Sequence, residues 1–150
     1  MRAVIQRVRE ASVAIGGREH ARIAHGLLVL VAAEVDDTAD DVAWLSGKIA
    51  RLRVFADDAG KMNRAVGEVG GRVLVVSQFT LFASTAQGNR PSFLRAARPE
   101  QAVPLYEAFV ARLDGDLGQP VQTGVFAADM QVGLVNDGPV TVIIDSRQRE

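Results

Sequence analysis

Two short polar segments hold the side chains of this chain that are best suited to chemistry. Ser77-Gln78-Phe79-Thr80 and Asn136-Asp137-Gly138-Pro139-Val140-Thr141 each follow an apolar run typical of a buried strand. The hydroxyl groups of Ser77 and Thr80 could act as nucleophiles in the hydrolysis of an ester or a peptide if a base lay beside them. Because sites tend to be built on loops and strand ends that a rigid scaffold holds, we expect the chemistry at these two segments.

The groups that usually support such chemistry are scarce. Histidine occurs only as His20 and His25, so a serine-histidine-acid triad needs one of them beside Ser77 or Thr80. The absence of cysteine excludes a thiolate nucleophile and a zinc site with sulfur ligands. The two histidines do not share a face of a strand, and no close carboxylate cluster accompanies them. The sequence therefore predicts no metal and no cofactor.

The size and charge of the chain limit the classes of function. With 150 residues, 48% of them hydrophobic, it is long enough for one domain with a substantial core. Its formal net charge of -1 gives no general attraction to nucleic acid, so any RNA contact must be local. One candidate is the irregular stretch 83–98, where Phe93 could stack on a base between Arg90 and other arginines. A solvated loop surface is the plainer interpretation of the same residues.

Nothing in the sequence indicates export or insertion into a membrane. Arginines interrupt the first apolar residues too early for a signal peptide. The longest uncharged apolar run, residues 26–33, is far shorter than the ~20 residues that span a bilayer. The lack of cysteine fits a reducing compartment. We therefore expect a cytoplasmic protein.

Hydrophobic periodicity predicts more strands than helices. Strands are expected at residues 3–8, 11–15, 26–31, 72–76, 121–126, 130–135 and 140–145. A capping box of Thr38 and Asp41 predicts an amphipathic helix over residues 38–53. A second helix is expected over residues 99–114, with its regular part beginning near Pro104, because proline is not tolerated deep inside a helix. This order predicts an α/β or α+β fold, a single domain in which two helices cover a mixed sheet.

Together, the two polar segments resemble the signature motifs of the D-aminoacyl-tRNA deacylase family. The similarity extends over nearly the whole chain and includes Ile5-Gln6-Arg7-Val8, Ala11-Ser12-Val13, Gly60-Lys61-Met62-Asn63, Gly88-Asn89-Arg90-Pro91-Ser92-Phe93, Gln122-Thr123-Gly124 and Phe126-Ala127-Ala128-Asp129-Met130. One departure is Phe82, at a position where an aromatic hydroxyl or a small residue is often found. Both motifs in order, with these segments between them, are much more specific than either motif alone.

The resemblance implies a curled, barrel-like sheet and an enzyme that hydrolyses the ester between tRNA and a D-amino acid, or glycine mischarged on tRNA(Ala). It also implies a homodimer in which Gly138 and Pro139, joined by a cis peptide bond, enter the active site of the partner subunit. Their carbonyl oxygens would accept hydrogen bonds from the substrate ammonium, so that an L side chain would clash with the main chain. By the same resemblance, Arg7 steadies this Gly-Pro pair.

The resemblance also implies that residues 77–80 hold the reacting ester. In the mechanism that we prefer, the free 2′-hydroxyl of the terminal adenosine helps to activate the attacking water. Backbone N–H groups near Phe79 and Thr80, together with Gln78, hold the carbonyl and stabilise its developing negative charge. Ser77 belongs to the same group, with Thr80 as a nucleophile or a positioning group. The residues expected around the adenosine and the tRNA are Phe126, Met130, Phe93 and Arg90.

Alternatives remain open at this point. Thr80 could be the nucleophile of a conventional esterase, which would depend on His20 or His25. An editing module like that attached to some threonyl-tRNA synthetases is a related alternative, and a noncatalytic RNA-binding module is a third. Locally, residues 136–141 could form an ordinary hairpin turn, and residues 77–80 a strand end with surface hydroxyls.

Overall fold

The sheet is built around its long first strand, which has antiparallel partners along both edges. In the computed structural model, which describes residues 1–149, β1 (Arg2–Ile15) turns through Gly16 and Gly17 into β2 (Arg18–Ile23), which leads into β3 (Gly26–Ala32). β2 pairs with the second half of β1 and β3 pairs with its first half. Both turn glycines have positive φ, 57° and 76°, a conformation that glycine adopts without steric cost. One edge of β1 is therefore covered along its length.

The other edge of β1 pairs with β8 (Gln131–Asp145). The prediction of two strands, at residues 130–135 and 140–145, joined through residues 136–139 is wrong, because both halves of this segment pair with β1 in the same direction. The two strands predicted at residues 3–8 and 11–15 are likewise one strand. In each case one long partner strand pairs with both halves, so the chain keeps its direction across the residues between them.

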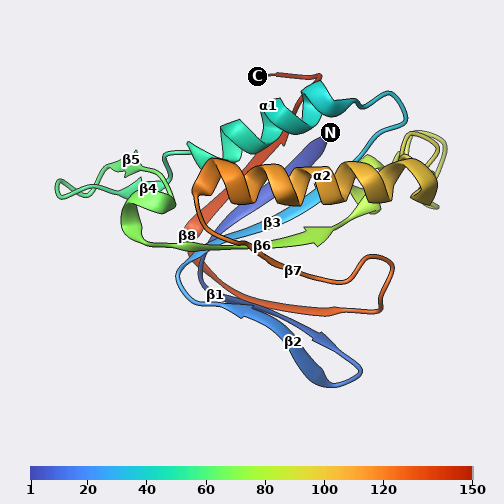
Figure 1. Ribbon diagram of the computed structural model, residues 1–150. Coiled ribbons are helices and arrows are strands. Elements are labelled where there is room, and N and C mark those ends of the chain that lie inside the picture. Colours follow the sequence, from blue (N-terminus) through green and yellow to red (C-terminus); the bar gives the residue numbers. More distant parts are fainter. Residues whose placement is uncertain (150) are drawn as a thin grey trace.

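Two parallel strands extend the sheet beyond β3, in the order β2-β1-β3-β6-β7. They are β6 (Arg72–Ser77) and β7 (Gln122–Thr123), and each requires a crossover connection. The first crossover contains α1 (Ala39–Ala50) and the second contains α2 (Pro99–Leu117). Figure 1 shows both helices on one face of the sheet, as crossovers of the same hand produce when the strand order advances in one direction.

The central strands are buried on both faces. Val29 and Val75 pack on the helix side with Phe109 of α2, whereas Leu28 and Leu74 pack on the inner side of the curled sheet. The curl brings β2 back into contact with β6 and β7, so the sheet is nearly closed into a barrel. Burial on both faces explains why β3 and β6 have continuous apolar sequences instead of alternating ones. The fold class predicted from the sequence is confirmed.

Both helices form near the predicted positions. The backbone N–H of Thr38 donates to the carboxylate of Asp41 at 2.9 Å, the capping box that the sequence predicts. The expectation that the regular part of α2 begins near Pro104 is wrong, because the helix begins at Pro99. Pro104 lies on the exposed side of α2, where water can reach the carbonyl of Glu100 that lacks its N–H partner.

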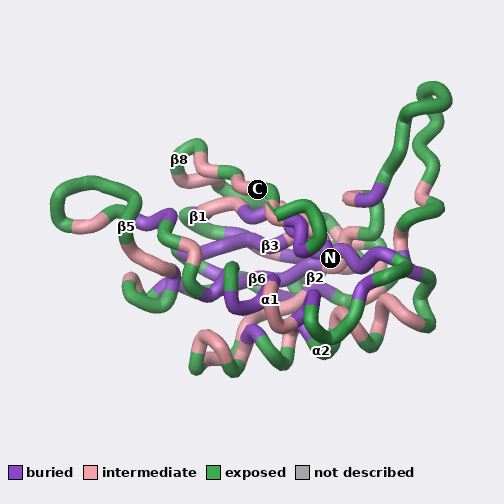
Figure 2. Tube along the Cα trace, turned by 90° about the horizontal axis from the view of Figure 1, so that it is seen from above, coloured by how far each residue is buried: buried purple, intermediate pink, exposed green. Residues whose placement is uncertain are grey.

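Two exposed segments project from this body. One is the hairpin of β4 (Phe55–Ala56) and β5 (Met62–Arg64), which leads to the short 3-10 helix η1 (Gly67–Val69). The other is an arm over residues 84–92, closed at its base by backbone hydrogen bonds of 2.8 Å in both directions between Ser84 and Ser92. Figure 2 shows both as exposed extensions. No helix within residues 1–149 is long and apolar enough to cross a membrane.

The strand predicted at residues 121–126 is reduced to β7. Only Gln122 and Thr123 form ladder pairs with β6; the N–H of Gly124 still donates to the carbonyl of Val75 at 3.0 Å, after which the chain leaves the sheet to enclose a pocket.

Candidate active site

A pocket of about 680 Å³ opens at the end of β6. The ends of β3 and β6, the first turns of α2 and the segment between β7 and β8 form its walls, and most of its lining is apolar. This size is typical of a small-molecule site. The residues predicted from the sequence that line it are Ser77, Gln78, Phe79, Phe93, Phe126 and Met130.

The end of β6 presents backbone donors at the edge of the pocket. The N–H of Gln78 donates to the carbonyl of Val31 at 2.8 Å, after which the chain turns into the 3-10 helix η2 (Phe79–Phe82). The side-chain amide of Gln78 donates to the hydroxyl of Thr80, which is exposed and does not line the pocket itself. Within residues 1–149, the N–H groups of Phe79 and Thr80 donate to no protein group. These two donors are free to bind a ligand.

Aromatic and small side chains shape the interior. The rings of Phe79 and Phe93 meet edge to face with their centroids 5.1 Å apart, and Tyr106 lies 6.2 Å from Phe126. Between these rings, small side chains leave the space open: Ala32, Ala33, Ala96, Ala97, Ala102, Ala127 and Ala128. The sequence alone did not indicate Tyr106 or the alanines as site residues. The one signal in the sequence for a hollow is that six of these alanines occur as adjacent pairs, at residues 32–33, 96–97 and 127–128.

The segment between β7 and β8 closes one side of the pocket. A Cβ atom at Gly124 would lie 2.6 Å from the sulfur of Met130, so glycine permits this close packing. Ala127 has φ of 62°, in the left-handed region, which costs roughly 1 kcal/mol for an alanine. Two charged side chains, Arg98 and Asp129, also line the pocket. Arg98 is the N-cap of α2, whose positive dipole end adds to its charge.

A second feature lies on β8. Residues 137–140, named here the Gly-Pro bulge, leave the ladder opposite the single residue Arg7 of β1. The peptide bond between Gly138 and Pro139 is cis. Both residues are exposed, and a Cβ atom at Gly138 would lie 2.3 Å from the backbone nitrogen of Val140. Only glycine fits this position without a shift of the backbone.

Two polar side chains hold the Gly-Pro bulge at its base. The amide of Asn136 donates to the carbonyls of Arg7 and Val140, at 3.0 and 3.2 Å. The Nε of Arg7 donates to the carbonyl of Asp137 at 2.9 Å, and another nitrogen of Arg7 donates to the carbonyl of Val54. Arg7, selected by resemblance, is therefore in direct contact with the Gly-Pro bulge.

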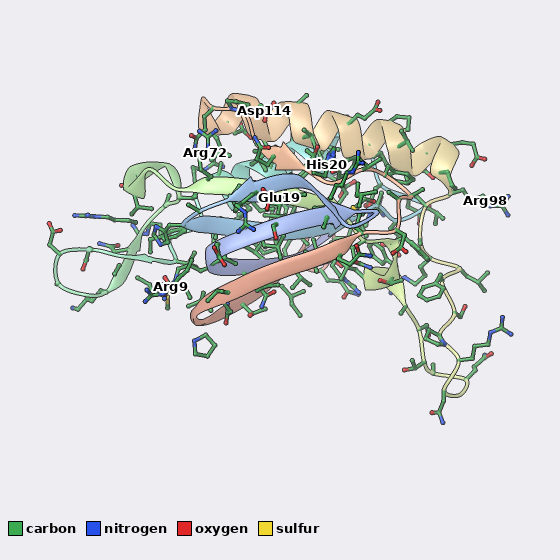
Figure 3. All side chains as sticks on the ribbon, turned by 90° about the horizontal axis from the view of Figure 1, so that it is seen from below. Arg9, Glu19, His20, Arg72, Arg98 and Asp114 are labelled. Atoms are coloured by element: carbon green, nitrogen blue, oxygen red, sulfur yellow. The ribbon has the colours of Figure 1, made fainter. Side chains whose placement is uncertain are left out.

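The pocket and the Gly-Pro bulge of one chain lie at opposite ends of the sheet. Along β3, the pocket edge is at Val31 and the partner of Arg7 is Leu27, a separation of about 13 Å at roughly 3.3 Å per residue. Figure 3 shows Arg98, which lines the pocket, and Arg9, which contacts the bulge, at opposite ends of the molecule. Neither Gly138 nor Pro139 lines the pocket of its own chain.

Other predicted residues lie elsewhere. Arg90 is on the exposed arm and does not line the pocket. The carbonyl of His25 accepts a hydrogen bond from the N–H of Arg72 at the start of β6, so His25 is about 16 Å along that strand from Ser77. His20 is exposed on β2. The geometry thus gives no support to a serine-histidine-acid triad, and no group of His, Asp and Glu within residues 1–149 is arranged to hold a metal ion.

Comparison with known proteins identifies the family. The family model described as D-Tyr-tRNA(Tyr) deacylase matches residues 4–145. The chain belongs to this family. The D-aminoacyl-tRNA deacylase of Cytophaga hutchinsonii is 62% identical over 150 residues, which is 100% of each chain. Membership of the deacylase family confirms the resemblance of the two motifs, and with it the prediction that the chain is a hydrolase of ester bonds.

Two solved structures share the fold of this deacylase family member. One, described as the c-Myc DNA Unwinding Element Binding Protein, is 39% identical with a TM-score of 0.90, and the match covers 97% of this chain and 98% of that chain. The other, a probable eukaryotic D-amino acid tRNA deacylase, is 15% identical with a TM-score of 0.83 and coverage of 95% and 97%. Both matches extend over the curled sheet and the two helices together.

Tyr106 provides a test of how closed the pocket is. Its hydroxyl donates to the carbonyl of Val75 at 3.2 Å, and burial raises its pKa from 10.0 to about 12. Because Tyr106 is the only tyrosine in the sequence, a pH titration of phenolate absorbance should show a single midpoint at about 12. The unfolded chain loses this proton near pH 10, so the free energy of unfolding should fall as the pH rises from 10.0 toward about 12. Tyr106→Phe should abolish the absorbance change, and a midpoint near 10 would contradict the burial.

Proposed function

We propose that this chain hydrolyses the ester bond of D-aminoacyl-tRNA and releases tRNA and a free D-amino acid. The observation that carries the proposal is the pair of free N–H groups of Phe79 and Thr80 at the edge of an apolar pocket, in a chain of the deacylase family. Such donors can bind the ester carbonyl and stabilise the oxyanion that forms when water attacks it. Chemistry of this kind requires no histidine. We expect the reaction in the cytoplasm.

The proposed reaction uses a hydroxyl of the substrate as its base. Water attacks the ester carbonyl carbon while the 2′-hydroxyl of the terminal adenosine accepts a proton from the water and passes its own proton to the 3′-oxygen; the tetrahedral intermediate then breaks the bond to that oxygen and leaves the free amino acid and a 3′-hydroxyl. Gln78 and Thr80, which are hydrogen-bonded to each other, position the ester. Phe79, Phe93 and Phe126 provide faces on which the adenine can stack. Arg98 at the pocket, and Arg90 on the arm, are cations for the tRNA phosphates.

The Gly-Pro bulge is proposed to select for handedness. The carbonyl oxygens of Gly138 and Pro139 would accept hydrogen bonds from the substrate ammonium, which fixes the direction of the fourth substituent on the α-carbon. An L side chain would then meet the main chain, whereas a D side chain would point outward. Glycine has no side chain to exclude, so glycyl-tRNA would also be hydrolysed.

This selection requires a homodimer, because the bulge does not reach the pocket of its own chain. Two observations support a symmetric pair. Gly138 and Pro139 are exposed, and the same strand β8 carries Ile143, which is 68% exposed and lines a groove of about 790 Å³ together with Val142 and Ile144. An exposed apolar strand next to a projecting loop is suited to a two-fold interface in which each copy inserts its bulge into the other.

Ester loss from matched D-, L- and glycyl-tRNA tests the function directly. We expect D-aminoacyl-tRNA and glycyl-tRNA to be hydrolysed at least about a hundredfold faster than L-aminoacyl-tRNA, since an L side chain would clash with rigid main chain. Gly138→Ala, whose Cβ forces the bulge to move, should lower both the D rate and the D/L ratio. Equal rates on D and L substrates would contradict the selection.

The role of the 2′-hydroxyl is tested by tRNA that ends in 2′-deoxyadenosine. We expect its single-turnover rate to fall by about a hundredfold or more, the usual contribution of acid-base catalysis. Thr80→Ala should lose only about tenfold, because Thr80 supports Gln78 and is not the nucleophile. An inactive Thr80→Ala with an unimpaired deoxy substrate would overturn the mechanism and favour the conventional esterase.

Mixing two variants with impaired hydrolysis of D-aminoacyl-tRNA tests whether the bulge acts in the partner subunit. Ala102→Trp fills the pocket and leaves the bulge intact. Gly138→Ala displaces the bulge and leaves the pocket open. After the subunits exchange at random, about half of the dimers are mixed and each has one complete site, so activity should return to about a quarter of the wild-type value. No recovery, despite native circular dichroism of both variants and exchange shown by a tagged subunit, would mean that the bulge acts within its own chain.

A further inference from the structure

The side chain of Asp137, the first residue of the Gly-Pro bulge, is surrounded by nitrogen atoms. Its carboxylate lies 3.3 Å from the Nε of Arg7, 3.4 Å from the Nε of Arg9 and 3.7 Å from the Nε2 of His25. Arg7 is 15% exposed and Asp137 is 24% exposed. Their attraction is therefore less screened by water than that of an ordinary surface pair.

Three parts of the chain converge to make this cluster. A second irregularity in the pairing of β1 with β8 lies between Val8 and Glu10, so Arg9 has no partner in the ladder. Arg7 and Arg9, on either side of the buried Val8, both reach Asp137. His25 comes from the link between β2 and β3, where its ring packs edge-on against Phe55, with centroids 5.1 Å apart. Figure 3 shows Arg9 at this end of the molecule.

The Gly-Pro pair has little to hold it in place apart from its neighbours. Gly138 has no side chain, and Pro139 is exposed and has no backbone N–H to donate. Asn136 fixes the base of the bulge, whereas the side chain of Asp137 belongs to the residue that is bonded to Gly138. Without the carboxylate, Arg7 would keep its hydrogen bonds to the carbonyls of Asp137 and Val54 but lose its ionic contact with the bulge, and the positive charges of Arg7 and the 76% exposed Arg9 would be uncompensated.

We propose that the Asp137 carboxylate is a positioning residue for chiral selection. By neutralising Arg7 and Arg9, it keeps the main-chain carbonyls of the next two residues aimed at the amino group of the substrate in the partner's pocket. The inference rests on the proposed function, because it assigns a task to the same bulge. It adds a specificity-determining side chain, whereas the selection itself is carried out by main-chain atoms.

The experiment compares Asp137→Asn and Asp137→Glu with the wild type in single-turnover hydrolysis of D- and L-aminoacyl-tRNA. Asp137→Asn keeps the shape but removes the charge, and we expect the D/L ratio to fall by about tenfold. Asp137→Glu keeps the charge and should recover the ratio to within about threefold of the wild type. Asp58→Asn is the matched control: Asp58 is 93% exposed and pairs with Arg64 at 2.8 Å, so its D rate and D/L ratio should be unchanged.

Several outcomes would overturn the inference. An unchanged D/L ratio in Asp137→Asn, with a selective wild type, would refute the role of Asp137 and leave the proposed function intact. Equal losses of activity in both variants, with the D/L ratio preserved and the thermal midpoint lowered, would show a merely structural role. A wild-type protein that hydrolyses no D-aminoacyl-tRNA would instead remove the proposed function on which the inference rests.

Discussion

The pairing of β1 with partners along both of its edges is the constraint on which the rest of the structure depends. β2 and β3 hold one edge, and β8 must follow the other from Gln131 to Asp145. Opposite Arg7, β8 has residues 137–140, and a ladder can accommodate this excess only by extruding it. The exposed Gly138 and Pro139 are thus a result of strand register, and the surrounding strands hold both ends of the bulge.

The same sheet produces the pocket at its other end, by different means. β6 ends at Ser77, where the chain turns into η2 and leaves two N–H groups without a protein partner. Alanines from several segments keep the adjacent space open, and Tyr106 stays neutral over a wide pH range because burial raises its pKa to about 12. Both ends therefore offer main-chain groups to the proposed substrate, with side chains used mainly to place them. This suits a chain with 2 histidines and no cysteine.

The sequence predicted the buried strands well, because burial on both faces requires an uninterrupted apolar run. It also predicted α1 from the capping box of Thr38 and Asp41, which is a local interaction. The errors arose where a distant partner overrides local preference. Asn136 and its neighbours are typical turn residues, yet pairing with β1 keeps them in one strand. Pro104 is tolerated inside α2 because its side of the helix faces water.

By itself, then, the sequence determined the fold class, the helix starts that local capping defines, and the two motifs that identify the family, since these are properties of neighbouring residues. Tertiary structure alone decided which residues share the pocket: the alanines and Tyr106 carry no local sign of a site, and they meet only after two crossovers bring α2 over β6. It also decided that Arg7, Arg9 and His25 gather around Asp137. The physical reason is that strand register sets these distances, and register depends on the pairing of segments more than a hundred residues apart along the chain.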